Sequence, residues 1–147
     1  MKALFIFGLV VVAIAFAFFF LRSRVAEHGT LNELPQRLTR LKEQDSDLKA
    51  FLGFCTRDED ALYFVHENGV FYLDYELTTP EKRNYADTFR KTASELGRTI
   101  INTSYSGDAP VLRIDAGPSE RQAADLGLEF TRRMFGHDEH TAFEFLP

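Results

Sequence analysis

The sequence has a single cysteine, Cys55, and this scarcity excludes two kinds of structure. One thiol forms no intramolecular disulfide, and it cannot supply a cysteine-based zinc site. We expect Cys55 to be a small buried apolar residue. Catalytic motifs are also lacking, because no serine has a nucleophile-elbow sequence around it and no glycine-rich phosphate loop is present. The sequence therefore favours a protein that is not an enzyme and that holds no cofactor.

Basic side chains are scarce in most of the chain. Lys2, Arg22 and Arg24 are three of the 17 lysine and arginine residues, which leaves 14 basic side chains in residues 25–147 against 22 acidic ones. This part of the chain therefore has a net charge of −8, whereas the whole chain has −5. An acidic domain repels phosphate backbones, which argues against nucleic acid as a partner.

Charged and strongly polar side chains are absent from residues 3–21. At about 1.5 Å rise per residue, a helix of this length spans roughly 28 Å, close to the hydrocarbon thickness of a bilayer. The segment lacks the polar face that a core helix of a soluble domain shows. We therefore predict a single transmembrane helix over residues 3–21 that anchors the chain in the lipid bilayer, with Lys2, Arg22 and Arg24 at its flanks.

A cleaved secretory signal peptide is the alternative for this segment. Ala13-Ile14-Ala15 and Ala15-Phe16-Ala17 have the small-residue spacing of a cleavage site. Apolar residues continue past both sites, however, through Phe18–Leu21. This continuation favours the uncleaved anchor.

The basic residues near the anchor predict its orientation. Lys2 precedes the helix, whereas Arg22 and Arg24 follow it at once and Arg37 and Arg40 come soon after. The positive-inside rule then predicts a protein of the cell membrane whose C-terminal domain lies in the cytoplasm. An exported C-terminal domain is the alternative.

Behind the anchor and its basic flank (residues 1–24) we predict a polar connector (residues 25–30) and one small α+β domain (residues 31–147). Capping residues and apolar spacing predict three helices, over Leu31–Leu52, Pro80–Leu96 and Ser119–Phe135. Runs rich in β-formers predict a hairpin over Ala61–Leu77, a strand pair over Arg98–Tyr105 and Val111–Asp115, and a terminal strand over Ala142–Leu146. Two hairpins favour an antiparallel sheet, which we expect about three helices to cover on one face.

This order of elements resembles that of the small α+β domains of type III secretion chaperones. The resemblance covers element order alone and includes no sequence motif. It implies helices on one face of an antiparallel sheet, and it implies no functional residue for this chain.

The first predicted helix, Leu31–Leu52, has two interpretations. An apolar stripe with alternating three- and four-residue spacing runs along it, interrupted by Asp45: Leu34, Leu38, Leu41, Leu48 and Leu52. We prefer a helix that packs on the sheet. A short stalk through which the chain self-associates is the alternative.

The hairpin Ala61–Leu77 turns at Asn68-Gly69, a pair that favours a two-residue type I′ turn. Glu67 then pairs with Val70, and this register divides the side chains between two faces. One face carries Leu62, Phe64 and Leu73 and is expected to meet the helices.

The other face of this hairpin is aromatic but mixed, and it carries Tyr63, Val65, Tyr72 and Asp74. Tyrosine at the centre of an exposed patch is a common anchor at protein interfaces, because it offers a large contact area with few rotamers to immobilise. We therefore predict that Tyr63, Val65 and Tyr72 contact a protein partner. The alternative is that the chain's own first helix or terminal segment covers them.

The most reactive-looking cluster is His137-Asp138-Glu139-His140. Two imidazoles and two carboxylates are suitable ligands for a divalent metal, so a small metal-dependent or hydrolytic enzyme is the alternative function. The spacing matches no established catalytic pattern, and the run follows Gly136. We therefore prefer a solvated loop here and a membrane-anchored, non-catalytic role in protein interaction or assembly.

Overall fold

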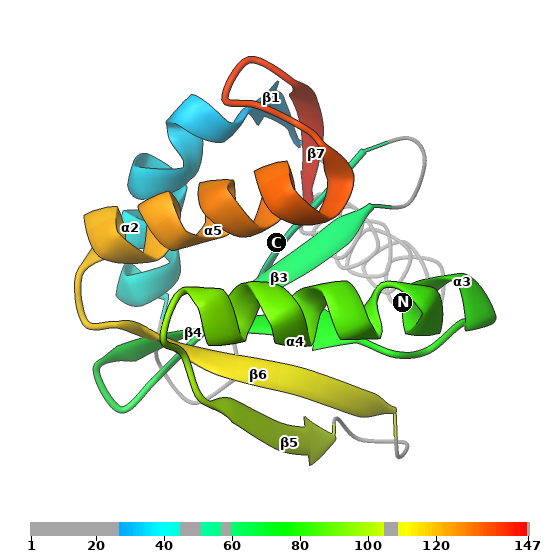
Figure 1. Cartoon of the computed structure of the whole chain (residues 1–147). Helices are drawn as coiled ribbons and strands as arrows, with labels where there is room; N and C mark the ends of the chain where they lie inside the picture. Colours follow the sequence, from blue (N-terminus) through cyan, green and yellow to red (C-terminus); the bar gives the residue numbers. More distant parts are fainter. Residues whose placement is uncertain (1–26, 45–50, 57–59, 105–108, 147) are drawn as a thin grey trace, which may run out of the picture.

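The computed structural model describes residues 27–44, 51–56, 60–104 and 109–146 (Figure 1). The strands are β1 (Glu27–Thr30), β2 (Phe51–Cys55), β3 (Ala61–Glu67), β4 (Val70–Glu76), β5 (Ile100–Ser104), β6 (Pro110–Gly117) and β7 (Ala142–Leu146). The helices are α2 (Leu34–Glu43), α3 (Pro80–Asn84), α4 (Ala86–Glu95) and α5 (Glu120–Phe135), and a 3₁₀ turn, η1 (Leu31–Glu33), precedes α2. The anchor predicted over residues 3–21 and its flanks Lys2, Arg22 and Arg24 lie outside the described residues. Within the described part of the chain, no helix is long and apolar enough to cross a membrane.

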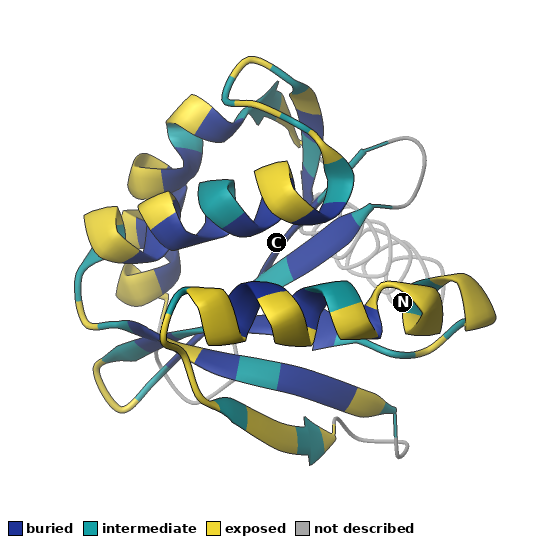
Figure 2. Ribbon diagram, viewed as in Figure 1, coloured by how far each residue is buried: buried dark blue, intermediate teal, exposed yellow. Residues whose placement is uncertain are grey.

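The strands form one antiparallel sheet in the order β1-β7-β2-β3-β4-β6-β5. Helices α2, α4 and α5 pack on one face of this sheet, and buried residues line their inner sides (Figures 1 and 2). The predicted α+β class, with an antiparallel sheet packed by three helices, is confirmed.

Aromatic side chains fill the layer between the helices and the sheet. Phe89 of α4 stacks on Tyr75 of β4 with ring centroids 5.6 Å apart, and it contacts Phe130 of α5 at 4.8 Å. Helix α5 approaches the sheet most closely at Gly127, where an added Cβ atom would lie 2.8 Å from Cζ of Phe64. The apolar face of this helix is buried throughout: Ala123, Leu126, Gly127, Phe130 and Met134.

Local capping interactions set the bounds of α5 and α3. The Ser119 hydroxyl accepts a hydrogen bond from the Gln122 N–H at the start of α5, and Gly136 ends that helix with φ 74°. The Thr79 hydroxyl accepts a hydrogen bond from the Lys82 N–H (3.2 Å) at the start of α3. The predicted helix ends are confirmed at all three positions.

The helix predicted over Pro80–Leu96 is interrupted at Tyr85, which separates α3 from α4. The hydroxyl of Tyr75 donates a hydrogen bond to the Lys82 carbonyl (2.9 Å), so a strand side chain uses an acceptor in the last turn of α3. Burial raises the pKa of Tyr75, which keeps this hydroxyl protonated. The Tyr85 ring packs edge-on against Phe135 of α5. These contacts from distant segments explain the interruption.

The first helix is shorter than predicted: α2 ends at Glu43, and Leu52 lies on β2. Strand β2 is the short apolar run Phe51–Cys55, and it pairs with β3 on one side and β7 on the other. A short apolar run has no helix or strand period of its own, so its distant pairing partners decide its conformation. Leu34, Leu38 and Leu41 are buried in the core, and Leu48 lies outside the described residues. The alternative interpretation, a self-associating stalk, required a helix that continues to Leu52. Leu52 instead lies on a strand.

Residues 27–30, predicted as part of the connector, form β1 and pair with β7. The Glu33 carboxylate accepts a hydrogen bond from the Thr30 N–H (3.2 Å), as the capping-box spacing predicts. This interaction and the adjacent Arg37 guanidinium lower the pKa of Glu33. This capping box lies at the start of η1. Pro35 follows in the first turn of α2.

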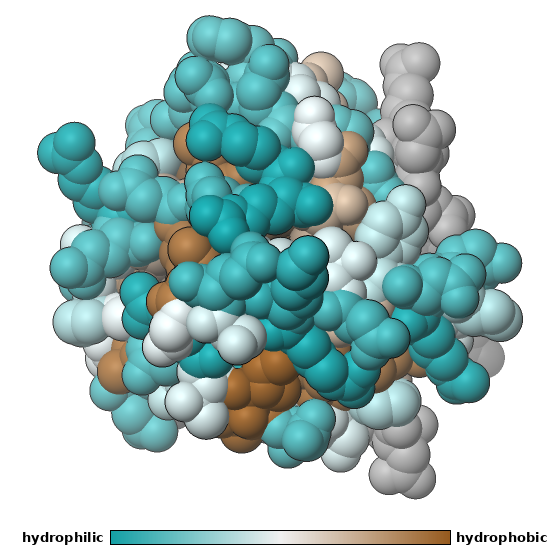
Figure 3. Space-filling model, viewed as in Figure 1, coloured by the Kyte–Doolittle hydropathy of each residue, from teal (hydrophilic) through white to brown (hydrophobic). Residues whose placement is uncertain are grey.

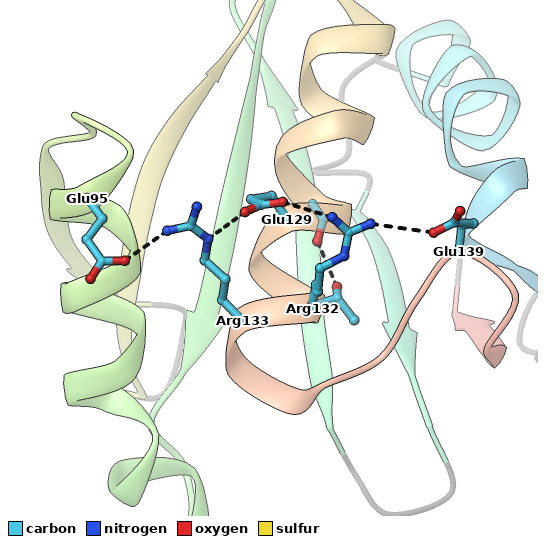
Figure 4. A network of polar contacts seen from close by, with 7 residues as sticks. Glu95, Glu129, Arg132, Arg133 and Glu139 are labelled. Carbon is cyan, nitrogen blue, oxygen red and sulfur yellow. Dashed lines mark hydrogen bonds and ion pairs between the residues drawn. The ribbon is translucent and has the colours of Figure 1, made fainter.

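A network of ion pairs joins three segments on the helical side of the domain (Figure 4). Arg133 of α5 contacts Glu95 of α4 at 2.8 Å and also contacts Glu129. Arg132 contacts Glu129 at 3.4 Å and Glu139, in the loop after α5, at 3.5 Å. These side chains are partly or largely exposed, so each pair contributes at most about 1 kcal/mol to stability.

The β3–β4 hairpin has the predicted register, with Glu67 opposite Val70 and Phe64 opposite Leu73. Both turn residues have positive φ, 53° at Asn68 and 78° at Gly69. Positive φ at both positions is what a type I′ turn requires.

Gly69→Val is expected to destabilise the domain by about 1–3 kcal/mol, because a β-branched residue resists positive φ. The effect should reflect backbone strain alone, since nothing in the described residues lies within 4 Å of an added Cβ atom at this position. Denaturant unfolding of wild type and variant measures the difference. Gly69→Asn is the matched control, because asparagine tolerates this conformation and should cost much less. Equal losses for valine and asparagine would contradict strain as the cause.

Candidate interaction surface

The face of the sheet opposite α2, α4 and α5, here called the outer face, carries the residues that the sequence proposed for partner binding. Residues directly opposite each other on antiparallel strands point to the same face. Val65 lies opposite Tyr72 on one side and Phe51 on the other, and Asp74 lies opposite Tyr63 and Arg113. The centre of the outer face therefore consists of six side chains from four strands: Phe51, Tyr63, Val65, Tyr72, Asp74 and Arg113.

Tyr63 is held between neighbouring aromatic and backbone groups. Its ring meets that of Phe51 edge-on, with centroids 6.2 Å apart. It also lies against the backbone of Gly53, where an added Cβ atom would be 3.1 Å from two ring carbons. Burial, followed by the nearby charge of Glu76, raises the pKa of Tyr63 to about 12. The phenol therefore stays neutral at physiological pH and provides contact area without acid–base chemistry.

The accessible part of the outer face differs from the sequence prediction in one respect. Val65 is only 3% exposed and so offers little surface to a partner. Phe51, which the sequence assigned to a helix, is 42% exposed beside it. Tyr63 and Tyr72 are half-buried. The aromatic ring of Phe51 thus supplies the exposed apolar area that the sequence attributed to Val65.

A buried ion pair lies beside these aromatic rings. Nε and one terminal nitrogen of Arg113 donate hydrogen bonds to the two carboxylate oxygens of Asp74 at 2.8 and 2.7 Å. The other terminal nitrogen donates to Glu67 at 3.2 Å, and the guanidinium carbon lies 5.0 Å from the centroid of the Tyr72 ring. Asp74 is fully buried, and such a carboxylate is tolerated only when it is paired and hydrogen-bonded. The pair neutralises the charge of Asp74 at the centre of the outer face.

The hairpin strands carry apolar side chains on both faces, and the outer face also carries the acidic residues Glu67, Asp74 and Glu76. An antiparallel sheet with one solvated face shows polar residues at every second position. Strand β3 instead places Leu62 and Phe64 towards the helices and Tyr63 and Val65 on the outer face. The helical side, by contrast, presents mainly hydrophilic side chains, with apolar ones visible between them (Figure 3). The outer face therefore combines aromatic and aliphatic side chains with a cluster of charged ones.

The side chains of the His137–His140 loop are directed to separate partners. Nε2 of His137 lies 2.9 Å from a carboxylate oxygen of Asp60. The Asp138 carboxylate accepts hydrogen bonds from the His140 N–H (2.9 Å) and the Thr141 hydroxyl (3.2 Å), and these bonds, the first above all, lower the pKa of Asp138. Glu139 contacts Arg132 of α5 (Figure 4). Among the described residues, no three His, Cys, Asp or Glu side chains come together as a metal site.

Comparisons with known proteins give no further assignment. No family model matches the chain, and no curated protein or solved structure shows significant similarity to it. The similarity to type III secretion chaperones remains an expectation from element order. By its described architecture, the chain contains an α+β domain in which three helices pack on a seven-stranded antiparallel sheet.

Proposed function

We propose that this protein is a non-catalytic, membrane-tethered domain that binds a second protein through its outer face. One observation supports the docking surface above all: the helices α2, α4 and α5 pack on one face of the sheet, yet the opposite face is also lined by aromatic and aliphatic side chains. Apolar surface of this kind gains free energy when another apolar element covers it.

The tether in this proposal is the apolar segment 3–21. Its length suits a bilayer, and by the positive-inside rule the basic residues after it favour a cytoplasmic location for the acidic domain. A tethered domain meets its partner at the membrane surface, where both chains are confined to a thin layer. This confinement raises the effective concentration and allows a modest interface to be occupied.

The partner in this proposal is a protein segment with an apolar centre and basic flanks. Phe51 and Tyr72 provide rigid contact area for the apolar centre. The net charge of −8 over residues 25–147 attracts a basic partner and repels anionic ones. Arg113 compensates the buried charge of Asp74 in the middle of the face, so apolar groups can approach there, whereas Glu67 leaves a negative charge at the edge of this cluster.

Site-specific photo-crosslinking in intact cells tests the proposal. A photoreactive residue at Phe51 should form an adduct with a separate protein, and the adduct should stay in the membrane pellet after an alkaline carbonate wash. Gln36, exposed on α2 at the helical side, is the matched control and should not give this adduct. Protease added outside the cells should leave the domain intact.

Tyr72→Ser provides the quantitative part of the same test. Truncation of an aromatic anchor costs an interface about 2 kcal/mol, so the adduct yield at Phe51 should fall by about thirtyfold at limiting partner concentration. A crosslink from Phe51 to residues 3–21 of the same chain would contradict the proposal, since the outer face would then be covered internally. A lipid adduct, or release of the chain by carbonate, would contradict it as well.

A further inference from the structure

The two edges of the sheet differ in how they are protected. An edge strand presents unpaired N–H and C=O groups, which readily pair with another strand unless charged residues, proline or a covering element prevent it. Strand β1, at one edge, is four residues long and carries Glu27, whose carboxylate lies 2.7 Å from Arg37 and 3.7 Å from Arg40. Strand β5, at the other edge, has five residues and contains no charged residue and no proline.

The side chains of β5 are those of a strand that is ready to pair. Three of the five, Ile100, Ile101 and Thr103, are β-branched and favour extended structure. Ile101 is 45% exposed, and Asn102 and Ser104 are also exposed. In the described residues, β6 is the one strand that pairs with β5, so the second edge of β5 has no strand partner there. This edge offers backbone hydrogen-bonding groups next to an exposed apolar side chain.

We infer that β5 pairs antiparallel with β5 of a second copy of this chain, so that the two sheets become continuous. Two identical edges related by a two-fold axis expose matching donors and acceptors, and each copy contributes the same contact to the other. If Asn102 lies on the axis, Ile101 of each copy faces Thr103 of the other. This contact does not involve the six central residues of the outer face and does not depend on their proposed role.

The charge distribution supports a second copy as the occupant. Two copies of the domain repel each other overall, because residues 25–147 carry a net charge of −8. A contact through the uncharged strand β5 brings no like charges into opposition between the two strands. Arg98 lies two residues before β5. In an antiparallel arrangement, the Arg98 residues of the two copies therefore lie at opposite ends of the contact. The uncharged edge strand is thus one that also offers backbone groups without a strand partner among the described residues.

The oligomeric state of the full-length chain in detergent tests this inference. Light scattering after size exclusion, corrected for bound detergent, should give two copies per particle for the wild type. Ile101→Lys and Asn102→Lys each add a charge at an exposed position of β5, on opposite faces of the strand, and should raise the dimer dissociation constant at least tenfold. Gln36→Lys adds the same charge on α2 and should leave the dimer unchanged. Midpoints of thermal unfolding close to that of wild type show that the variants are folded.

Disulfide mapping then locates the contact. Directly opposed residues of an antiparallel pair have Cα atoms about 4.5–5.5 Å apart, within reach of a disulfide bond. In a Cys55→Ser background, cysteine at Ile101, Asn102 or Thr103 should give a dimer crosslink at the position nearest the two-fold axis, whereas cysteine at Asp87 on α4 should give none. A monomeric wild type overturns the inference. It does so even if β5 is then found to pair with a different protein. A dimer that survives both lysine variants, or that crosslinks at none of the three positions, overturns it too.

Discussion

Arg113→Met should destabilise the domain by about 3–5 kcal/mol, because it leaves the buried carboxylate of Asp74 without its bidentate partner. Arg113 donates two short hydrogen bonds to Asp74 and a third to Glu67, and methionine replaces none of them. The free energy of unfolding from denaturant titration at neutral pH measures this loss. Arg113→Lys should lose less stability than Arg113→Met, because lysine keeps the positive charge. It should still be less stable than wild type, because lysine cannot form the two parallel hydrogen bonds.

The double variant Asp74→Leu/Arg113→Met separates the cost of removing Arg113 alone from the net contribution of the ion pair to stability. Replacing both partners of a buried ion pair with apolar residues is often neutral or stabilising. The double variant should therefore recover most of the stability that Arg113→Met loses. If Arg113→Met unfolds with a free energy within about 1 kcal/mol of wild type, Asp74 is solvated in solution. The description of Asp74 as a buried carboxylate that depends on Arg113 would then be wrong.

Phe64→Ala should destabilise the domain by about 3–5 kcal/mol, the loss typical of deleting a fully buried aromatic ring. Phe64 has no exposed surface and stacks on Phe54 with ring centroids 5.6 Å apart. Its ring also fills the space that Gly127 leaves on α5. The substitution therefore removes contacts within the sheet and between the sheet and α5. The free energy of unfolding measures this change.

Gly127→Ala provides a control that depends on the size match between these two residues. In the wild type, the added methyl group would lie 2.8 Å from the Phe64 ring, and overpacking of this kind costs about 1–3 kcal/mol. In the Phe64→Ala background the ring is gone, so the same substitution should stabilise the domain by up to about 1 kcal/mol through helix propensity. An effect of the same sign in both backgrounds would contradict direct packing of Phe64 on Gly127.

The two largest predicted effects concern opposite faces of the sheet, at Phe64 of β3 and Arg113 of β6. Phe64 secures the helical layer, whereas Arg113 and Asp74 secure the outer face. Because the outer face contains a fully buried carboxylate, its side chains are positioned before any partner arrives, which reduces the entropy lost on binding. Substitutions at exposed Phe51 should therefore change partner binding more than stability.

The sequence by itself determined the elements whose specifying interactions lie within a few residues. The turn at Asn68-Gly69 and the register of β3 and β4 follow from local backbone preference. The bounds of α5 follow from the hydroxyl of Ser119 and the left-handed conformation of Gly136. The shared face of Tyr63, Val65 and Tyr72 follows from the same register, because side chains alternate along a strand.

Tertiary structure alone decided the features that depend on partners far away in the chain. Strands β1 and β2 are short and depend on pairing partners: β1 pairs with β7, at the other end of the domain, and β2 lies between β3 and β7. The interruption at Tyr85 depends on contacts from β4 and α5, and the pair Asp74–Arg113 joins residues 39 positions apart. Local preference is worth tenths of a kilocalorie per residue, whereas pairing and burial contribute more, so they override it where the two disagree.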